Sequence, residues 1–271
     1  MYSHWPEGLI DPLAKSMGLI MICCLLCCHP AGQAAHRGLT YVHGGITRGP
    51  MDQPQLALVF TGDEFADGAP YLRKVLADRQ TPASFFLTGN FYRNPEFEVL
   101  IEGLIQEGHY LGAHSDQHLL YCSWEDRDSL LVSREEFTRD LDDNYQELHR
   151  FGIDKEAAPY FLPPYEWYNE DISRWTSEYG LSLINYSPGT LSHADYATPS
   201  MAAYRSSEVI FDSILSFEVR APEGLNGFIL LSHIGVSPER EDKFYHHIDA
   251  LIDTLTTRGY EFVSLAQLLE T

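Results

Sequence analysis

Cysteine is nearly missing from most of this chain. Four of the five cysteines lie together in residues 23–28, and only Cys122 follows them. A single thiol cannot form an internal disulfide, so the fold beyond residue 28 must depend on its hydrophobic core. Cys122 lies near His118 in the sequence and is a conceivable metal ligand, but a lone cysteine is more often a small buried side chain.

Positive charge is also scarce. The 271 residues include 18 Lys and Arg against 39 Asp and Glu, which gives a formal net charge of −21. Such a surface repels nucleic acid and anionic membranes, so we expect no nucleic-acid partner. A neutral substrate, such as an acetylated sugar, is compatible with this charge.

No apolar run is long enough for a membrane-spanning helix. The run from Met17 to Cys28 has the length of the apolar region of a signal peptide, and Ala31–Ala35 offers small residues for cleavage. We therefore expect residues 1–35 to be a signal peptide, and the mature chain to have no membrane span. Its destination would be the periplasm, the cell envelope or the extracellular space. The alternative is a lipoprotein signal with a lipid anchor on Cys27 or Cys28.

Candidate strands and helices alternate after a polar lead-in at residues 36–55, which we expect to be extended. The strands are predicted at 56–60, 83–87, 110–113, 159–162, 181–185, 228–231 and 261–263. The helices are predicted at 70–79, 95–106, 133–150, 170–178, 205–216, 242–258 and 265–269, and Ser133 with Glu136 forms a capping box. This order predicts one α/β domain over residues 56–271, with a parallel sheet that right-handed crossovers close toward a barrel.

Polar residues follow four of these strands. Asp63 and Glu64 follow the first, and the segment His114–His118 follows the third. Glu166 and His233 follow two later strands. Because the carboxyl ends of parallel strands meet at one edge, these side chains should share a site.

The two histidines of the segment His114–His118 are four residues apart and can face the same way. Neutral imidazole is a common ligand of zinc and similar metals, and two imidazoles make half of a tetrahedral site. This spacing alone is weak evidence, and a carboxylate from elsewhere is needed to complete a catalytic site.

At this point the chain resembles a known family, the polysaccharide deacetylases of carbohydrate esterase family four. The segment Glu107–His118, EGHYLGAHSDQH, is similar to the family's GHEIGNHTxxH motif. Residues 56–64, LALVFTGDE, resemble its LTFDD motif, and residues 161–165, FLPPY, resemble FRPPY. Residues 230–233, LLSH, resemble its LxH motif, and all four occur in the family's order.

The resemblance implies a distorted (β/α) barrel of about seven strands and a hydrolase with one divalent metal, zinc first, with cobalt or nickel as alternatives. The metal ligands implied are Glu64, His114 and His118. Asp63 is the implied base and His233 the implied acid, while the Tyr165 backbone N–H helps hold the oxyanion. In this scheme a metal-activated water attacks the acetyl carbonyl of a polysaccharide or oligosaccharide.

The chain departs from the family's pattern at three places. Glu64 stands where the family has Asp, so Asp63 and Glu64 could exchange roles. Leu162 stands where the family has the Arg that pairs with the base, and Arg240 or Lys243 could replace it. The acidic, Trp-containing fourth motif has no clear match, which leaves Asp242 and Asp195 as candidate partners of His233.

Several further residues near these strand ends have open roles. Asp67 is an outside candidate for the third metal ligand, although a turn acid before Gly68 is the simpler interpretation. Glu166 could reach the site or the substrate. Aromatic rings could stack on sugars or belong to the core, and the candidates are Tyr121, Trp124, Trp167 and Tyr168.

Three functions remain open from the sequence. The leading hypothesis is a metal-dependent deacetylase that acts on N-acetyl or O-acetyl groups, and an acetylxylan-type esterase is the alternative within that class. The alternative outside it is a catalytically impaired protein that binds carbohydrate, suggested by Leu162 and the missing fourth motif.

Overall fold

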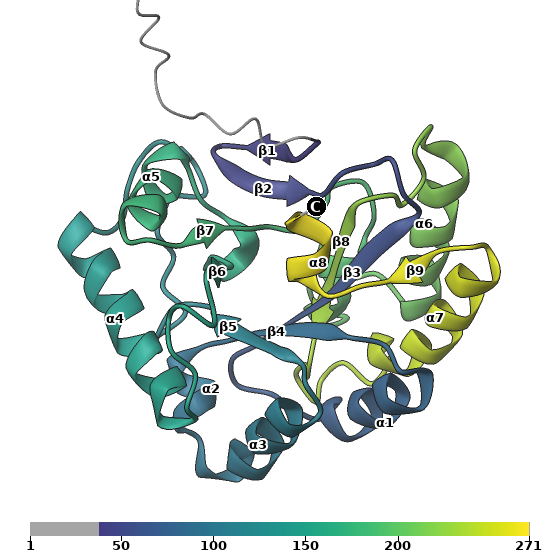
Figure 1. Cartoon of the computed structure of the whole chain (residues 1–271), viewed down its shortest axis with the longest axis horizontal. Helices are drawn as coiled ribbons and strands as arrows, with labels where there is room; N and C mark the ends of the chain where they lie inside the picture. The colour runs from purple at the N-terminus through teal and green to yellow at the C-terminus, as the bar shows by residue number, and fades with distance from the viewer. Residues whose placement is uncertain (1–37, 271) are drawn as a thin grey trace, which may run out of the picture. The chain divides into compact units, whose positions relative to one another are not determined.

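The computed structural model describes residues 38–270 of the chain (Figure 1). The predicted signal peptide at residues 1–35 lies outside the described residues. Within residues 38–270 there is no helix with the length and apolar character needed to cross a membrane.

Within residues 38–270, nine strands form one sheet at the centre of the domain. Seven of them are in the order β2-β8-β3-β4-β5-β6-β7, with β1 beside β2 and β9 beside β3. The pairs from β8 through β7 are all parallel, as the alternation of strands and helices predicts. The strands span Thr40–Val42 (β1), Gly45–Arg48 (β2), Gln55–Gly62 (β3), Ala83–Leu87 (β4), Tyr110–Ala113 (β5), Tyr160–Phe161 (β6), Ser182–Leu183 (β7), Phe228–His233 (β8) and Glu261–Phe262 (β9).

The lead-in expected to be extended at residues 36–55 instead contributes a hairpin to the sheet. Strands β1 and β2 pair antiparallel, and β2 continues onto β8. Ile46 of β2 also forms a bridge with Ile184, just after β7, and the Asn185 N–H donates to the Ile46 carbonyl at 2.7 Å. The hairpin therefore joins the two edges of the sheet and helps to close the distorted barrel. The sequence did not predict this role, because the hairpin is polar and buries few apolar residues.

Most of the helices lie around the outside of the strands in Figure 1, whereas α8 lies close to β3 and β8. They span Ala69–Arg79 (α1), Gly89–Arg93 (α2), Glu98–Gln106 (α3), Arg134–Arg150 (α4), Glu170–Glu178 (α5), Ser207–Arg220 (α6), Ile248–Thr257 (α7) and Leu265–Leu269 (α8). All the predicted helices are present, and among the described residues α2 is the additional helix that the sequence did not predict. Short 3-10 turns occupy Pro95–Phe97 (η1), Pro164–Glu166 (η2), Ser192–Tyr196 (η3) and Phe244–His247 (η4).

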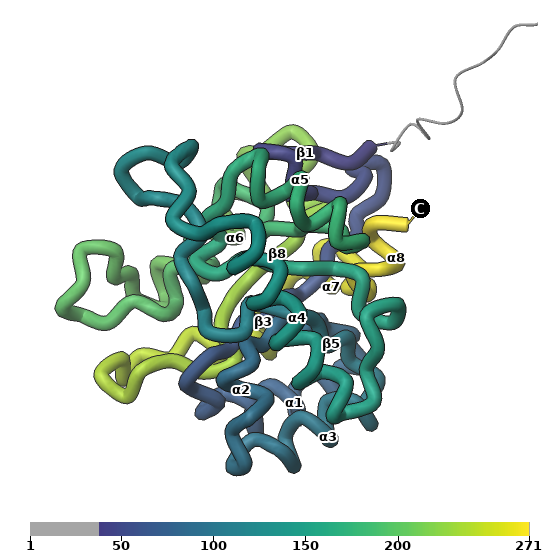
Figure 2. The backbone as a smooth tube through the Cα atoms, turned by 90° about the vertical axis from the view of Figure 1, so that its left-hand side faces the viewer, coloured from purple at the N-terminus to yellow at the C-terminus, as the bar shows by residue number. Residues whose placement is uncertain are grey.

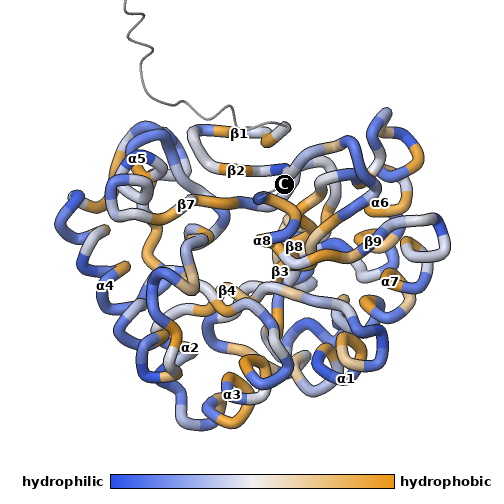
Figure 3. Tube along the Cα trace, viewed as in Figure 1, coloured by the Kyte–Doolittle hydropathy of each residue, from blue (hydrophilic) through white to orange (hydrophobic). Residues whose placement is uncertain are grey.

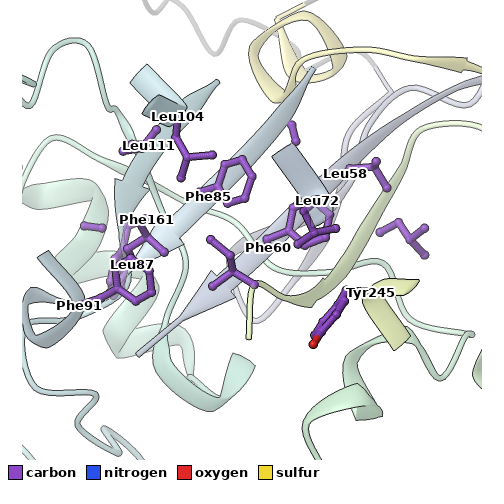
Figure 4. Packing of buried hydrophobic residues seen from close by; sticks show 14 of the residues in the cluster. Leu58, Phe60, Leu72, Phe85, Leu87, Phe91, Leu104, Leu111, Phe161 and Tyr245 are labelled. Carbon is purple, nitrogen blue, oxygen red and sulfur yellow. The ribbon is translucent and has the colours of Figure 1, made fainter. Parts of the chain in front are cut away.

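Alternation along the strands divides the core into two clusters. Phe60 and Phe85 belong to the larger cluster, which packs between the sheet and the helices, and their rings stack at 5.2 Å (Figure 4). Ala57 and Val59 belong to the smaller cluster, together with Leu268 of α8. Side chains of one strand alternate between its two faces, so the smaller cluster is the barrel interior. The strands are mostly apolar in colour while the helices also carry hydrophilic residues (Figure 3).

Continuing this alternation to the carboxyl ends of the strands predicts which side chains lie over the barrel interior. Residues 57, 59 and 61 share one face of β3, and residues 229, 231 and 233 share one face of β8. Thr61 pairs with His233 across these strands. Both side chains therefore lie at the end of the barrel interior, where the functional site is expected.

Candidate active site

A pocket of about 670 Å³ lies at the carboxyl ends of the strands, a size that suits a small ligand. Three loops that contribute to it project from one side of the domain in Figure 2, after β5 (teal), after η3 (green) and after β8 (yellow-green). The pocket brings together all six predicted site residues, namely Asp63, Glu64, His114, His118, Tyr165 and His233.

Helix α4 positions the loop that carries His114 and His118. Its Asp140 accepts hydrogen bonds from the Asp116 and Gln117 N–H groups at 3.2 and 3.3 Å. Asn144, one turn later, accepts the His114 N–H at 2.9 Å. These two polar residues lie on the buried face of the helix, where an unpaired polar group would be costly, so they are committed to positioning this loop.

The two histidines are arranged as a pair with one free nitrogen on His114. The His114 Nδ1 lies 2.7 Å from the Leu162 carbonyl oxygen, which can only accept, so Nδ1 carries the proton and Nε2 keeps a lone pair. The ring centres of His114 and His118 are 5.2 Å apart. Burial lowers the pKa of both histidines, which favours the neutral form that binds metal.

The two adjacent acids have different surroundings. Asp63 is half-buried, and its Oδ1 accepts from the Thr88 hydroxyl at 2.8 Å and from the Asn90 amide at 3.3 Å. Asp63 also opposes the effect of burial on the pKa of His118, which indicates that it lies close to that histidine. Glu64 lines the pocket too, but it is exposed, and its carboxyl has no hydrogen bond among residues 38–270.

These residues fit a divalent metal by donor type. His114 presents Nε2, and the anchoring of Asp63 through Oδ1 leaves Oδ2 available, as is usual for a ligand held by surrounding hydrogen bonds. Within the described part of the chain, however, no three His, Cys, Asp or Glu side chains form a group that could hold a metal ion as they stand. Two imidazoles are in place, and a carboxylate has to approach them.

His233 has a carboxylate partner that the sequence named only as a candidate. Its Nδ1 lies 2.6 Å from the Asp195 Oδ1, and its backbone N–H donates to Oδ2 at 3.0 Å. Burial lowers the pKa of His233, but Asp195 and then Glu166 outweigh burial, so the pKa lies above its ordinary value. Asp242, the other candidate, accepts the Ser207 N–H at 2.6 Å instead.

Among the described residues that line the pocket, no lysine or arginine replaces the arginine missing at Leu162. Leu162 is fully buried in the barrel interior. Arg240, which the sequence offered as a replacement, is also fully buried and donates to the carbonyl oxygens of Ala197, Arg205 and Asp242. The suggestion for Arg240 is therefore wrong, because its guanidinium group is already occupied by main-chain acceptors.

Lys243 and Asp67 form an ion pair of 2.9 Å, and neither residue lines the pocket. Lys243 also donates to the carbonyl oxygens of Val236 and Ser237, and Asp67 accepts from Val236 N–H and Tyr245 hydroxyl. Lys243 therefore does not replace the arginine either, and Asp67 is a structural turn acid. The neutral Thr88 and Asn90 are the groups that anchor Asp63.

Arg240→Ala is expected to reduce stability rather than to alter catalysis directly. The substitution removes the donors to the Ala197 and Arg205 carbonyl oxygens, leaves the Asp242 carbonyl with the Ser207 hydroxyl alone, and creates a cavity, so we expect the free energy of unfolding to fall by about 3 kcal/mol. Urea denaturation measures this change. Arg205→Ala, at an exposed position, is the matched control and should cost less than about 0.5 kcal/mol. Equal effects of the two substitutions would contradict the assignment.

Tyr165 and Glu166 form an unusual bend after β6. Both have left-handed backbone angles, with φ of 59° and 54°. The Glu166 N–H donates to Pro163 and the Trp167 N–H to Pro164, while no hydrogen bond within residues 38–270 involves the Tyr165 N–H. This free donor suits the oxyanion role that the resemblance implies.

The aromatic candidates divide between pocket and core. Trp124 lines the pocket and is 55% exposed, and its ring packs edge-on against Tyr165 at 5.6 Å. Tyr121 and Tyr168 are fully buried in the core, so they cannot stack on a substrate. Trp167 is covered by the Arg127 guanidinium at 3.3 Å. Cys122 is buried, and burial raises the pKa of its thiol to about 11, which is unlike a metal ligand.

Several residues of the site were not predicted from the sequence. Thr88 is the N-cap of α2 and Asn90 lies within it, and the sequence analysis missed this helix. The clearest sign in the sequence of residues that support the site was in α4, where the polar Asp140 and Asn144 interrupt an apolar face one turn apart. Polar residues at such positions indicate a buried hydrogen-bond network.

Comparisons with known proteins identify the family and the fold. The family model described as polysaccharide deacetylase matches residues 48–184. A chitin deacetylase of Colletotrichum lindemuthianum is 28% identical over 222 residues, which cover 80% of this chain and 80% of the relative.

Two solved structures share the fold. One is a family 4 acetyl xylan esterase from Clostridium thermocellum in complex with a cobalt ion, with a TM-score of 0.62 and 22% identity over 80% of this chain and 90% of that chain. The other is a family 4 pseudoenzyme from Bacillus anthracis, with a TM-score of 0.65 and 16% identity over 84% of this chain and 70% of that chain. These identities support a shared fold and no more. The fold, the pocket at the strand ends and the family match over half of the sequence together show that this chain belongs to the polysaccharide deacetylase family.

Proposed function

We propose that this chain is a metal-dependent hydrolase that removes acetyl groups from an acetylated polysaccharide or oligosaccharide. The observation that carries the proposal is the arrangement of the His114 and His118 pair beside the His233–Asp195 pair in one pocket. A divalent metal, with zinc the first candidate, would supply a Lewis acid and lower the pKa of water. Export of the chain is part of this proposal and rests on the apolar run at residues 17–28.

The residues of the chain divide the remaining work. The two histidines and one carboxylate would bind the metal, and the free N–H of Tyr165 would stabilise the oxyanion. His233 would donate a proton from Nε2 to the leaving group, because Asp195 holds the proton on Nδ1 and favours the charged ring. Trp124 would stack on a sugar ring at the rim.

We further propose that Asp63 is the carboxylate ligand and Glu64 the base, which is the exchange of roles left open by the sequence. Two observations support it: Asp63 is anchored by two hydrogen bonds and lies near His118, whereas Glu64 is exposed and has no hydrogen bond among the described residues. A ligand is usually held by such surrounding hydrogen bonds.

Asp63→Asn and Glu64→Gln are expected to have different effects. Asp63→Asn should weaken zinc binding by about 10²-fold or more, because it removes an anionic ligand. Glu64→Gln should keep zinc bound and reduce acetate release about 10²-fold, as expected for loss of a base. Calorimetric titration with zinc and an acetate assay separate the two roles. Loss of zinc in Glu64→Gln alone would restore the assignment of Glu64 as ligand and Asp63 as base.

A second candidate function is carbohydrate binding without catalysis. It is favoured by Leu162 in place of the arginine, and by the lack of an assembled three-residue metal group within residues 38–270. The test of both functions is an acetate assay on the purified chain with zinc, cobalt or nickel. The substrates are chitin oligomers, acetylxylan and peptidoglycan fragments. Acetate release supports the hydrolase, while sugar binding without any release at saturating metal supports the binding protein.

A further inference from the structure

Glu166 places a carboxyl group in the pocket that accepts no hydrogen bond from the described residues. It lines the pocket and is partly buried, and no hydrogen bond from residues 38–270 reaches its carboxyl oxygens. A buried carboxyl group normally accepts hydrogen bonds, because leaving it without them is costly. The unused oxygens of Glu166 are therefore available to a ligand in the pocket.

The position of Glu166 is imposed by its backbone. A left-handed conformation costs roughly 1–2 kcal/mol for a residue with a side chain, and Tyr165 and Glu166 adopt it in succession. The bend is held by Asn185, whose amide donates to the Glu166 carbonyl at 2.9 Å. Asn185 is itself tied to Ile46 of β2, so the hairpin that closes the barrel also supports this bend.

The neighbours of Glu166 include the acidic Asp195, which is the hydrogen-bond partner of His233. Glu166 interacts with both His233 and Asp195, and burial is the main cause that raises its pKa to about 7. Among the described residues that line the pocket there is no lysine or arginine. His233 is the histidine that interacts with Glu166, and it becomes neutral after it has donated its proton.

A second polar group on the same side also lacks a partner. Thr61 is 1% exposed and lines the pocket, and its hydroxyl oxygen has no hydrogen-bond partner within the described residues. It lies opposite His233 in the register of β3 and β8. The side of the pocket from which His233 donates its proton therefore offers a carboxyl and a hydroxyl to the leaving group.

The two bonds that the family's chemistry can cleave leave different groups at this position. Water and an N-acetyl group give acetate and a protonated amine, because the nitrogen leaves the carbonyl carbon and gains two protons. Water and an O-acetyl group give acetate, a neutral hydroxyl group and a released proton. Only the first reaction places a positive charge beside His233 and Glu166.

We propose that Glu166 binds the amino group released from an N-acetylated sugar, and so makes this pocket selective for N-acetyl over O-acetyl substrates. This inference rests on the proposed deacetylase function and narrows it to amide bonds. Glu166 acts here as a specificity residue that contacts the leaving group, with the Thr61 hydroxyl as a second acceptor.

The direct test is a binding measurement with the purified, zinc-loaded full chain. Calorimetry compares tri-glucosamine, which carries amino groups, with tri-N-acetylglucosamine, which carries none. In Glu166→Gln the dissociation constant for tri-glucosamine should rise about tenfold, while that for the acetylated trimer changes less than about twofold. Glu166→Asp, which keeps the charge, should lose less affinity than Glu166→Gln.

Glu239→Gln is the matched control, because Glu239 lines the same pocket but is exposed. It should bind both trimers with affinities within about twofold of the parent. The inference is overturned if Glu166→Gln leaves tri-glucosamine binding unchanged, if it weakens both trimers equally, or if Glu239→Gln weakens tri-glucosamine as much. Thermal unfolding of each variant identifies any loss of folded protein.

Activity gives a second, separate readout. In Glu166→Gln, kcat on chitin trimer should fall about tenfold while the release of acetate from acetylxylan stays within twofold of its parent value. Equal losses on the two substrates contradict the inference. If the parent chain releases no acetate at all, the proposed function fails, and the binding comparison still decides whether Glu166 recognises an amine.

Discussion

His114→Ala and His118→Ala are each expected to abolish the binding of one zinc ion and to lower acetate release by at least about 10³-fold. The reason is the loss of a Lewis acid, which supplies several kcal/mol of transition-state stabilisation, and each 1.36 kcal/mol corresponds to a factor of ten in rate. The Nε2 of His114 has no substitute in the pocket, since its Nδ1 is already hydrogen-bonded to Leu162. Calorimetric titration with zinc and an acetate assay measure the two effects.

His149→Ala is the matched control for these variants. His149 lies on α4 with 75% of its side chain exposed, and its ring pairs with Asp154 far from the pocket. It should keep the zinc site and the full rate. A His114→Ala or His118→Ala variant that still released acetate at the parent rate would show that the histidine pair is not the catalytic metal site.

The second large effect is expected from Asp195→Asn. A proton donor works only while it is protonated, so activity falls as the pH rises through the pKa of His233. Asp195 is the main group that raises this pKa against burial, and it also keeps the proton on Nδ1. The substitution should lower kcat on the order of 10²-fold and move the alkaline limb of the pH–rate profile to lower pH.

Asp242→Asn separates this effect from a general loss of structure. Asp242 caps the start of α6 through the Ser207 N–H and has no hydrogen bond to His233. Its substitution should reduce stability and leave the alkaline limb in place. If the limb does not move in Asp195→Asn, or moves equally in Asp242→Asn, then Asp195 does not control the proton on His233.

The sequence predicted those elements whose apolar or capping pattern is evident within a few consecutive residues. The apolar run at 56–60 and the capping box of Ser133 and Glu136 both occur as predicted, in β3 and at the start of α4. Helix α2 has only five residues, and a segment this short has no clear helical period. The hairpin of β1 and β2 was missed because its few buried residues are set by contacts with β8 and Ile184, which are distant in the sequence.

Prediction of the candidate site was limited in the same way, by contacts between residues that are distant in the sequence. Residues that follow a strand within a recognisable motif could be predicted to meet, and the six predicted side chains do line one pocket. Asp195 could not be singled out, because nothing in its local sequence distinguishes it from Asp242. The anchoring of Asp63 by Thr88 and Asn90 depends on a contact between two strand ends, which only the folded chain displays.

Leu162 illustrates how a departure from a motif can be misread. A missing arginine suggested a replacement by another cation, and the two nearest candidates in the sequence were Arg240 and Lys243. In the structure, Arg240 and Lys243 both form hydrogen bonds or ion pairs with other groups. Asp63 is instead held by hydrogen bonds from the neutral side chains of Thr88 and Asn90. These hydrogen bonds fix the position of the Asp63 carboxyl, which suits the proposed ligand role.

The central claim is that the His114–His118 pair and the His233–Asp195 pair form one metal-dependent deacetylase site. The most direct measurement is acetate release from N-acetylated chitin oligomers by the purified chain, first stripped with a chelator and then supplied with zinc. The account predicts no release by the stripped chain and restored release after zinc is added. Equal release with and without the metal, or none at saturating zinc, cobalt and nickel, would contradict it.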